Sequence, residues 1–279
     1  MSIFSKKFLF IVLISFAVLF LSLLSKKLRI DKEAEKLSGK NFDVIKIVPK
    51  NGKTYYTQGL FFVDDDILYE SGGLYDKSTI TKMKYPSMDI IKETKLKNDQ
   101  FAEGIARVGD YVYQLTWRER VINKYKLDSL EKVDEIEMDE KMREGWGLTD
   151  YKDGEIIAND STHRIFILDE NTFKVKKIIP IYKNGNPING LNDMAYDGKY
   201  LYSNVYFGTY ILKIIPETGE IVDWYDMNSL VNYELNKETL KRSSLESGDV
   251  LNGIAYNSKR NIFVVTGKRW GNVYEVSFK

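Results

Sequence analysis

Residues 103–115 read EGIARVGDYVYQL, with a short strand-like run on either side of the turn residues Gly109-Asp110. Val, Ile and Tyr favour strands and a Gly-Asp pair favours chain reversal, so the stretch predicts a β-hairpin. Related hairpins recur along the chain, and their second strands contain ILYES (67–71), YVYQL (111–115), EIIAN (155–159), YLYSN (200–204) and NIFVV (261–265). Repeats of this length are typical of β-propeller blades.

The repeats have a nearly constant period. Equivalent positions are Tyr69, Tyr113, Ile157, Tyr202 and Phe263, which are separated by 44, 44, 45 and 61 residues. The last interval is long because residues 228–250 form an insertion, which we predict to be a short helical or loop excursion near the rim. Further strand-like runs, such as VINKYKL (121–127) and KVDEIEM (132–138), bring a unit to four strands, which is the plan of a propeller blade.

The two ends of the repeat region complement each other. The fifth copy stops at VYEVSF (273–278), one strand short, while FDVIKIV (42–48) precedes the first copy without a partner. Pairing these two runs would complete the last blade and remove an exposed strand edge. No linker rich in Pro, Gly or Ser interrupts residues 42–279, so we predict one all-β domain, a five-bladed β-propeller.

The N-terminal segment is apolar. Residues 8–25, FLFIVLISFAVLFLSLLS, form an uncharged run of 18 residues, near the lower limit for a helix that crosses a bilayer. Two lysines follow at 26–27 and no A-x-A cleavage pattern is present, which favours an uncleaved signal anchor over residues 1–27; a cleaved signal peptide is the alternative. Both place the body outside the cytoplasm, anchored to a membrane or secreted. The charged residues 28–41 are interpreted as a tether.

Composition excludes several function classes. Without the four lysines that flank the apolar segment, the body has 37 basic and 40 acidic residues, so it lacks the positive charge with which proteins bind nucleic acid. The chain has no cysteine and one histidine, His163, which follows Asp160-Ser161-Thr162 in a predicted exposed turn. Disulfides, thiolate chemistry and a His-rich metal centre are excluded, and a Ser-His-Asp triad would have to use His163.

The polar residues of the repeats point to one mouth of the channel. Each inner strand opens with a related pattern: Gln58-Gly59-Leu60, Glu103-Gly104-Ile105, Trp146-Gly147-Leu148, Asn192-Asp193-Met194 and Asn252-Gly253-Ile254. The next strand runs antiparallel, so its end lies at the same mouth. Those ends carry Glu70-Ser71-Gly72, Thr116-Trp117, Asp160-Ser161, Val205-Tyr206 and Gly267-Lys268.

Such a ring combines carboxylates, one lysine, amides and aromatic rings, which favours a small-ligand site. Gly, Asn and Trp at these positions also occur for packing alone. Glu103 and Lys268 are harder to explain as structural residues, because Glu and Lys are rarely buried without a partner.

Eight ordered motifs carry a family resemblance over residues 42–279. They are YTQGL (56–60), ESGGLYDKS (70–78), FAEGI (101–105), LTW (115–117), EGWGLT (144–149), LND (191–193), LNGIAY (251–256) and TGKRW (266–270). Together they resemble the plant- and bacterial-type glutaminyl cyclases, or glutaminyl-peptide cyclotransferases. The resemblance implies a five-bladed propeller that converts the N-terminal glutamine of peptides to pyroglutamate and releases ammonia without a catalytic metal.

The resemblance also implies roles for individual residues. Glu103 matches the catalytic carboxylate of the family. Gln58, Asn192 and Lys268 match its polar pocket, and the aromatic walls correspond to Tyr56, Trp117, Trp146 and Tyr206. The chain departs from the family at Tyr206, where Trp is usual, at Asp193, where LNE is usual, and at Tyr56, where Phe is usual. The change at Tyr206 puts substrate affinity in doubt more than reaction type.

These roles define a mechanism to be tested against the structure. Glu103 would take a proton from the attacking α-amine and return it to the leaving nitrogen, and Lys268 or the amides of Gln58 and Asn192 would hold the developing oxyanion. We expect no cofactor, although the channel leaves room for a structural cation, and we expect a monomer whose partners are peptides or proteins with N-terminal Gln and, through residues 8–25, a membrane.

Two other functions are compatible with a propeller. A non-catalytic, membrane-tethered propeller could bind peptides or cell-envelope components, but it would not need Glu103, Trp117 and Lys268 together. A lactonase-like hydrolase would need a carboxylate-rich calcium site, and the inner-strand openings offer only Glu103 and Asp193.

Overall fold

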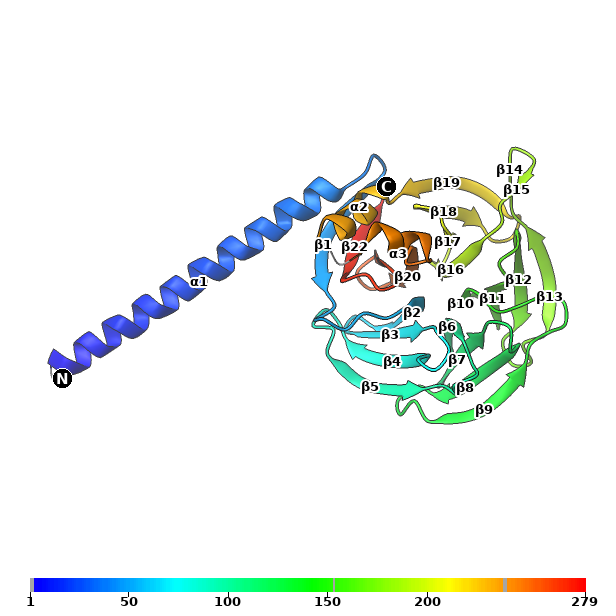
Figure 1. The fold of residues 1–279 in the computed structure, drawn as a ribbon, viewed down its shortest axis with the longest axis horizontal. Coiled ribbons are helices and arrows are strands. Elements are labelled where there is room, and N and C mark those ends of the chain that lie inside the picture. The colour runs from blue at the N-terminus through cyan, green and yellow to red at the C-terminus, as the bar shows by residue number, and fades with distance from the viewer. Residues whose placement is uncertain (1–2, 153, 238–239) are drawn as a thin grey trace.

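Five β-sheets surround a common axis (Figure 1). The computed structural model describes residues 3–152, 154–237 and 240–279, with side chains except at residues 3–11, 14, 17, 26, 27, 242 and 244. The predicted five-bladed propeller is confirmed. The N-terminal helix and two short helices between the last blades are added to it.

The first three blades each contain four strands, here given from the inside outward. Blade 1 consists of β2 (Thr57–Asp64), β3 (Ile67–Gly72), β4 (Thr79–Lys84) and β5 (Ile90–Lys95). Blade 2 consists of β6 (Ala102–Val108), β7 (Tyr111–Thr116), β8 (Val121–Lys126) and β9 (Lys132–Glu137). Blade 3 consists of β10 (Leu148–Asp150), β11 (Glu155–Asn159), β12 (Arg164–Asp169) and β13 (Val175–Pro180).

The fourth and fifth blades depart from this plan. Blade 4 contains β16 (Leu191–Tyr196), β17 (Leu201–Val205), β18 (Tyr210–Ile215) and β19 (Glu220–Asp226), and a small hairpin of β14 (Tyr182–Lys183) and β15 (Asn186–Pro187) extends its outer edge. Blade 5 contains β20 (Leu251–Asn257), β21 (Ile262–Gly267), β22 (Asn272–Phe278) and, outermost, β1 (Phe42–Pro49).

Strand β1 closes the ring as predicted. It pairs antiparallel with β22, from Phe42 opposite Phe278 to Pro49 opposite Asn272, so the start of the propeller supplies the outer strand of its last blade. The first and last strands of the propeller are therefore hydrogen-bonded to each other, and neither leaves an exposed, unpaired neighbour at the closure.

The hydrophobic core lies between neighbouring blades. Between blades 2 and 3, for example, Leu115 packs with Leu148 and Phe166, which are all fully buried. The inner strands approach so closely that some positions admit no side chain: a Cβ on Gly104 would lie 2.4 Å from the backbone nitrogen of Leu148. This close approach explains the recurring glycine at the strand openings.

Gly147→Ala tests this close approach. A Cβ at residue 147 would lie 2.1 Å from the backbone oxygen of Asn192 and 2.8 Å from the side-chain nitrogen of Asn159. We expect the substitution to lower the free energy of unfolding by about 1–3 kcal/mol, as overpacking does. Denaturant unfolding measures this, with Ser258→Ala as an exposed control that stays within about 0.5 kcal/mol of the wild type. Equal stability of the two variants would contradict the explanation.

The N-terminal helix α1 (Ile3–Leu37) projects from the propeller (Figure 1). It continues through most of residues 28–41, the predicted tether, because Ile30, Ala34 and Leu37 recur on one helical face and pack against the core of blades 4 and 5. Among the residues that the structure describes, no helix combines the length and apolar character needed to cross a bilayer. The predicted anchor includes side chains outside the described set, so it stays a prediction.

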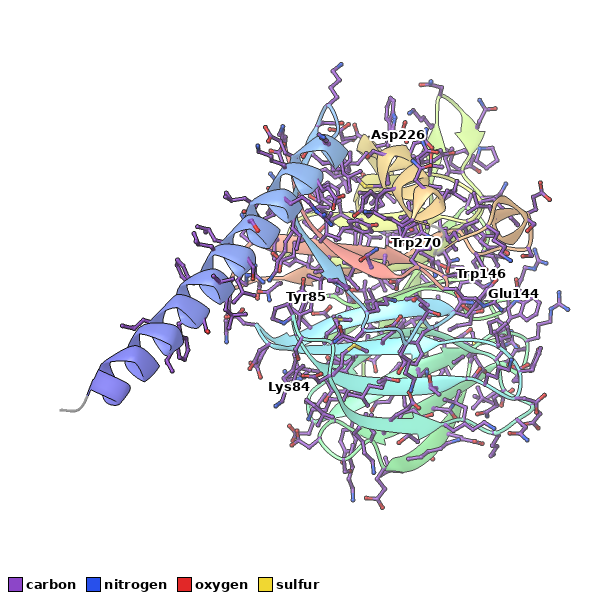
Figure 2. The ribbon with its side chains drawn as sticks, turned by 60° about the vertical axis from the view of Figure 1, so that its left-hand side comes forward. Lys84, Tyr85, Glu144, Trp146, Asp226 and Trp270 are labelled. Carbon is purple, nitrogen blue, oxygen red and sulfur yellow. The ribbon has the colours of Figure 1, made fainter. Side chains whose placement is uncertain are left out.

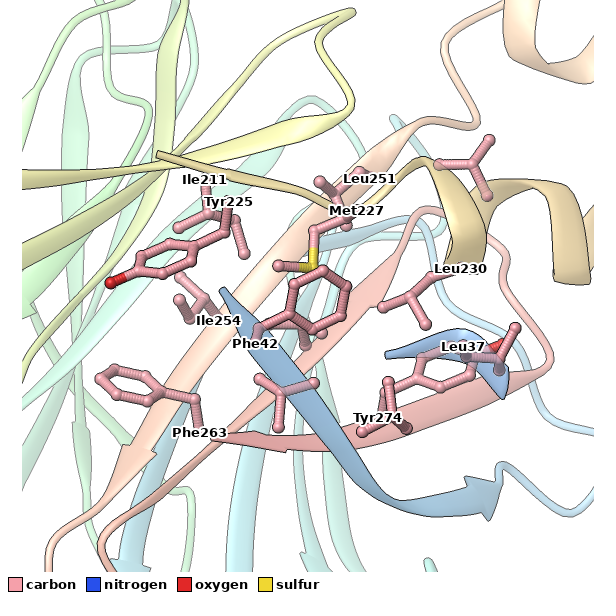
Figure 3. Packing of buried hydrophobic residues seen from close by; sticks show 14 of the residues in the cluster. Leu37, Phe42, Ile211, Tyr225, Met227, Leu230, Leu251, Ile254, Phe263 and Tyr274 are labelled. Carbon is pink, nitrogen blue, oxygen red and sulfur yellow. The ribbon is translucent and has the colours of Figure 1, made fainter. Parts of the chain in front are cut away.

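The described residues of the insertion form two short helices. They are α2 (Asn228–Asn236) and α3 (Arg242–Glu246), and they lead from the outer strand of blade 4 to the inner strand of blade 5. Leu230 of α2 packs with Leu37 of α1 and with Phe42 and Tyr274 of the last blade (Figure 3). The predicted helical excursion is therefore docked on the propeller.

Candidate active site

A cavity of about 190 Å³ opens at the end of the propeller where the inner strands begin. Its walls contain all eight residues proposed from the sequence and one more, Phe101: Tyr56, Gln58, Glu103, Trp117, Trp146, Asn192, Tyr206 and Lys268 complete the list. Phe101 stands two residues before Glu103, as Tyr56 stands two residues before Gln58, so comparison of the repeats could have identified it.

A larger cavity, of about 720 Å³, lies at the opposite mouth. It is lined by the far ends of the inner strands, and its charged residues include Arg107, Asp150 and Asp197. The smaller cavity is the better candidate for chemistry, because a buried carboxyl group and a buried amine, those of Glu103 and Lys268, both face it.

Glu103 lies at the second position of β6 and is 4 % exposed. Its Oε1 accepts a hydrogen bond of 3.3 Å from Nε2 of Gln58. Burial raises the pKa of this carboxyl well above its ordinary value; the positive charge of Lys268 lowers it, and the nearby acids Glu144, Glu119 and Asp193 raise it further. A carboxyl group with a raised pKa is suited to accept and return a proton near neutral pH.

Gln58 is oriented by Asn252. The Nδ2 atom of Asn252 donates to Oε1 of Gln58 at 3.1 Å and to the backbone oxygen of Thr57 at 2.9 Å, which leaves the amide nitrogen of Gln58 directed to Glu103. Asn252 was predicted as a member of the ring at the mouth. It lies instead behind the cavity wall, fully buried, where it fixes which end of the Gln58 amide faces the carboxyl group.

Lys268 follows β21 in a tight loop and is 3 % exposed. Its Nζ lies 4.7 Å from the ring centroids of both Tyr56 and Tyr206, so the amine is held between two aromatic faces. Burial lowers the pKa of Lys268 to about 8, although the charges of Glu103 and Asp249 act in the opposite direction. The amine and the carboxyl group of Glu103 form no direct ion pair, and each influences the pKa of the other.

The aromatic walls form two groups. On one side the rings of Phe101 and Trp117 meet edge to face at 5.6 Å, and on the other those of Trp146 and Tyr206 meet edge to face at 5.2 Å. The indole nitrogen of Trp146 donates to Glu144 at 3.0 Å, and these two residues lie side by side at the rim (Figure 2). The walls are therefore held by ring contacts and by a hydrogen bond outside the cavity.

The two tyrosines at which the chain departs from the family contact each other. The hydroxyls of Tyr56 and Tyr206 share a hydrogen bond, and the Tyr56 hydroxyl also lies 3.3 Å from the backbone oxygen of Gly248, to which it donates. Tyr206 replaces Trp and Tyr56 replaces Phe in the family pattern, so both changes add a hydroxyl at the same point. The wall keeps its aromatic faces on either side of Lys268.

Two polar atoms of the wall have no protein partner. They are the indole nitrogen of Trp117, a donor, and Oδ1 of Asn192, an acceptor, and both are buried. A buried polar group without a partner is unfavourable, so each of these atoms would gain a hydrogen bond if its side chain turned toward a bound ligand.

Asp193 lies below the cavity, beside the propeller axis. Its carboxylate accepts the backbone N–H of Ile254 at 2.8 Å, and its own backbone N–H donates to Oδ1 of Asn252 at 3.3 Å. Burial raises the pKa of Asp193 well above its ordinary value. The residue joins the inner strands of blades 4 and 5 and does not line the candidate site.

His163 does not line the cavity either. It precedes β12 at the edge of blade 3, and its Nε2 lies 3.4 Å from the hydroxyl of Tyr182. His163 lies in a turn as predicted, but its side chain is half-buried, not fully exposed. Within residues 3–152, 154–237 and 240–279, no three His, Asp or Glu side chains gather as a metal site would need.

Comparisons with known proteins identify the family of the chain. A family model described as glutamine cyclotransferase matches residues 16–278. A glutaminyl-peptide cyclotransferase from Arabidopsis thaliana is 31 % identical over 229 residues, which cover 80 % of this chain and 67 % of the relative. The crystal structure of glutaminyl cyclase from Myxococcus xanthus superimposes with a TM-score of 0.74 at 25 % identity, over 85 % of this chain and 96 % of that one. On the family match and the sequence identity, the chain belongs to the glutamine cyclotransferase family.

Proposed function

We propose that the protein is a glutaminyl-peptide cyclotransferase, an aminoacyltransferase that converts the N-terminal glutamine of peptides or proteins to pyroglutamate. The observation that carries this proposal is one small aromatic cavity faced by both Glu103 and Lys268. Family membership supports the same reaction. In that reaction a bond forms between the α-amine nitrogen and the γ-carbonyl carbon, and ammonia leaves from the same carbon.

The size of the cavity supports a substrate that enters by its terminal residue. About 190 Å³ is less than the roughly 300–1,000 Å³ typical of sites that enclose a whole ligand. The N-terminal glutamine would fill the space, and the rest of the peptide would lie outside the mouth. A substrate with a free N-terminus satisfies this geometry, whereas an internal glutamine does not.

Glu103 is the proposed proton carrier. Its carboxylate takes a proton from the α-amine as that amine attacks the γ-carbonyl, and the carboxyl group then gives the proton to the departing amide nitrogen. The hydrogen bond from Gln58 holds the carboxyl group in one orientation during both transfers. Because burial raises the pKa of Glu103, the group is a stronger base than a solvated glutamate and is better matched to this cycle.

Lys268 is the proposed stabiliser of the oxyanion. When the amine attacks, negative charge develops on the γ-carbonyl oxygen, and a buried ammonium group stabilises that charge more strongly than a solvated one does. The two tyrosine rings that flank the Lys268 amine limit its movement. A positioned charge of this kind needs little reorganisation when the oxyanion forms.

The walls are proposed to fold the substrate. A glutamine side chain is flexible, and cyclisation requires its γ-carbonyl to approach its own α-amine; the rings of Trp117 and Trp146 would hold it in that shape. The free donor on Trp117 and the free acceptor on Asn192 would bind the amide or amine of the same residue. These contacts would favour the reactive conformation and would select glutamine over apolar residues.

The pH dependence tests the role of Lys268. The pKa of about 8 means that the amine is charged below pH 8 and neutral above it, so we expect kcat/KM for a Gln-initiated dipeptide to fall as the pH rises through about 8. Arginine remains charged throughout this range, so the falling limb should disappear in Lys268→Arg, even if its maximal rate is lower. A falling limb that is unchanged in this variant would contradict the assignment.

Metal independence is part of the proposal. Every step assigned above is a proton transfer or a charge stabilisation that Glu103 and Lys268 supply. The test is ammonia release from Gln-Ala by the purified protein, with and without EDTA, and we expect equal rates. Loss of activity on chelation, restored by one metal ion, would contradict metal independence. No ammonia in either condition would contradict the enzyme and favour the peptide-binding propeller.

Location and assembly also belong to the proposal. We propose that residues 8–25 either hold the chain at a membrane or direct its export, because they form an uncharged apolar run of 18 residues. The catalytic body would then act outside the cytoplasm as a monomer. Cell fractionation with a C-terminal tag separates the two alternatives: the full-length chain in the membrane fraction supports an anchor, and a shortened chain in the medium supports cleavage.

A further inference from the structure

The loop between β21 and β22 determines where the Lys268 amine lies. Arg269, the next residue, has φ +58°, a left-handed conformation that only a tight turn imposes on a non-glycine residue. The fully buried ring of Trp270 folds back over Gly267, so closely that a Cβ there would lie 2.2 Å from it. The position of Lys268 therefore depends on whatever fixes this loop.

The insertion holds the first half of the loop. The backbone N–H of Lys268 donates to the backbone oxygen of Val250 at 2.9 Å. One terminal nitrogen of Arg269 lies 2.7 and 3.0 Å from the two carboxylate oxygens of Asp249, which is 3 % exposed. Residues 249–250, the end of the insertion, thus bind both the backbone of Lys268 and the side chain of its neighbour.

The insertion also holds the second half of the loop, through α2. Glu234 is fully buried, and its Oε2 accepts the backbone N–H of Gly271 at 3.0 Å. Its Oε1 accepts Nδ2 of Asn272 at 2.9 Å and the hydroxyl of Tyr274 at 2.5 Å. A buried carboxylate is costly unless it is well hydrogen-bonded, and an apolar side chain could fill the same space. These three bonds all fix the loop or the start of β22.

The end of the insertion touches the aromatic faces around Lys268 as well. Gly248 has φ +97°, and a Cβ on it would lie 2.8 Å from the hydroxyl of Tyr56 and 2.9 Å from that of Tyr206. The rings on either side of the amine therefore rest against the same segment whose next two residues bind the loop. Substitution at Gly248 would displace them.

We propose that the described part of the insertion, residues 228–237 and 240–250, is a clamp that positions Lys268 for oxyanion stabilisation, with Glu234 and Asp249 as its positioning residues. This inference rests on the proposed cyclotransferase function, in which Lys268 acts on the developing oxyanion. It assigns a catalytic purpose to the insertion that interrupts the blade repeat. Neither Glu234 nor Asp249 lines the cavity, so both act through the loop.

The test is Glu234→Gln, which keeps the size of the side chain. The amide nitrogen of glutamine is a donor and cannot accept the hydrogen bonds that one of the two carboxylate oxygens now accepts. We expect kcat for Gln-Ala to fall by between about 10- and 100-fold, as small misplacement of a catalytic group does, with KM changed less than about twofold. A loop that moves toward solvent would also let the pKa of Lys268 rise from about 8, so the falling limb of the pH profile should shift to higher pH.

Glu275→Gln is the matched control. Glu275 is an equally buried glutamate on β22 itself, and it binds the hydroxyl of Tyr85 and the guanidinium of Arg260, away from the loop. We expect this variant to lose stability but to keep the wild-type kcat and pH profile. If Glu234→Gln lost stability but kept the wild-type kcat and pH profile, as the control should, the clamp would be refuted. The proposed cyclotransferase function would be unaffected by that result.

A double-mutant comparison covers the case in which Glu234→Gln does not fold. Asp249→Asn is expected to lower kcat in the wild-type background and to have no further effect in Lys268→Met, because its influence passes through Lys268. An equal loss in both backgrounds would overturn the inference. Wild-type protein without any ammonia release would instead refute the proposed function, before any variant is compared.

Discussion

Glu103→Gln is expected to lower kcat for a Gln-initiated dipeptide by about 10²–10⁴-fold, the range in which general acid–base catalysis contributes. Glutamine has the same size as glutamate but cannot accept the α-amine proton or return it to the leaving nitrogen. KM should change little, because the aromatic walls and the side chain of Asn192 remain. Steady-state ammonia release measures both constants.

The stability of the Glu103→Gln variant shows whether its lower kcat reflects the loss of proton transfer or a loss of folded protein. Burial raises the folded-state pKa of Glu103 above its unfolded value, so the folded chain binds more protons and its stability falls as the pH rises through this range. Glu103→Gln cannot titrate at this position and lacks this loss, so its stability relative to that of the wild type should increase as the pH rises. Thermal melts of both proteins over a series of pH values test this. A variant with near-wild-type turnover would refute the assignment of Glu103.

Lys268→Met is expected to have the second largest effect, a fall in kcat of about 10²–10³-fold, as for the loss of one oxyanion-stabilising donor. Methionine fills a similar space between the two tyrosine rings and carries no charge. Because the charge of Lys268 lowers the pKa of Glu103, its removal should also shift the rising, acidic limb of kcat to higher pH. Lys82→Met, which removes a lysine of β4 that is paired with Asp128, is the control with unchanged turnover.

Lys268→Met is also expected to change how the free energy of unfolding depends on pH. The pKa of Lys268 is about 8 in the folded chain, below the ordinary value of 10.5, so the unfolded chain binds more protons between these two values. The stability that Lys268 contributes therefore rises with pH across that window and is lowest below pH 8. Lys268→Met should melt at the same temperature as the wild type or higher at pH 7, and a marked decrease would indicate a structural role.

The blades could be predicted from the sequence because their signals are local. A hairpin such as residues 103–115 contains its strands and its turn within a few residues, and the period of 44–45 residues repeats that signal. The pairing of β1 with β22 followed from one unpaired run at each end. The same periodicity placed Glu103 and Lys268 at one mouth, since antiparallel neighbours bring a strand start beside a strand end.

The parts that were missed depend on contacts between distant residues. The pattern of Ile30, Ala34 and Leu37 is short and lies within a charged segment, so its docking on the propeller became visible only with the partner surface in place. Glu234 looks like any acidic residue of a polar insertion until its hydrogen bonds to the Lys268 loop are seen. Asn252 was predicted to line the mouth, but it lies behind the residues that do. The repeat period shows how far along its strand a residue lies, but it does not show where the side chain points.

The measurement that tests the central claim most directly is an isotope experiment on the wild-type protein. Gln-Ala with labelled side-chain nitrogen is incubated in heavy-oxygen water, and both products are analysed by mass spectrometry. The proposed reaction predicts that the label leaves entirely as ammonia, that the peptide retains its α-nitrogen within a pyroglutamyl ring, and that no solvent oxygen enters it. A glutamyl product carrying solvent oxygen would indicate hydrolysis of the amide and would contradict cyclisation by Glu103 and Lys268.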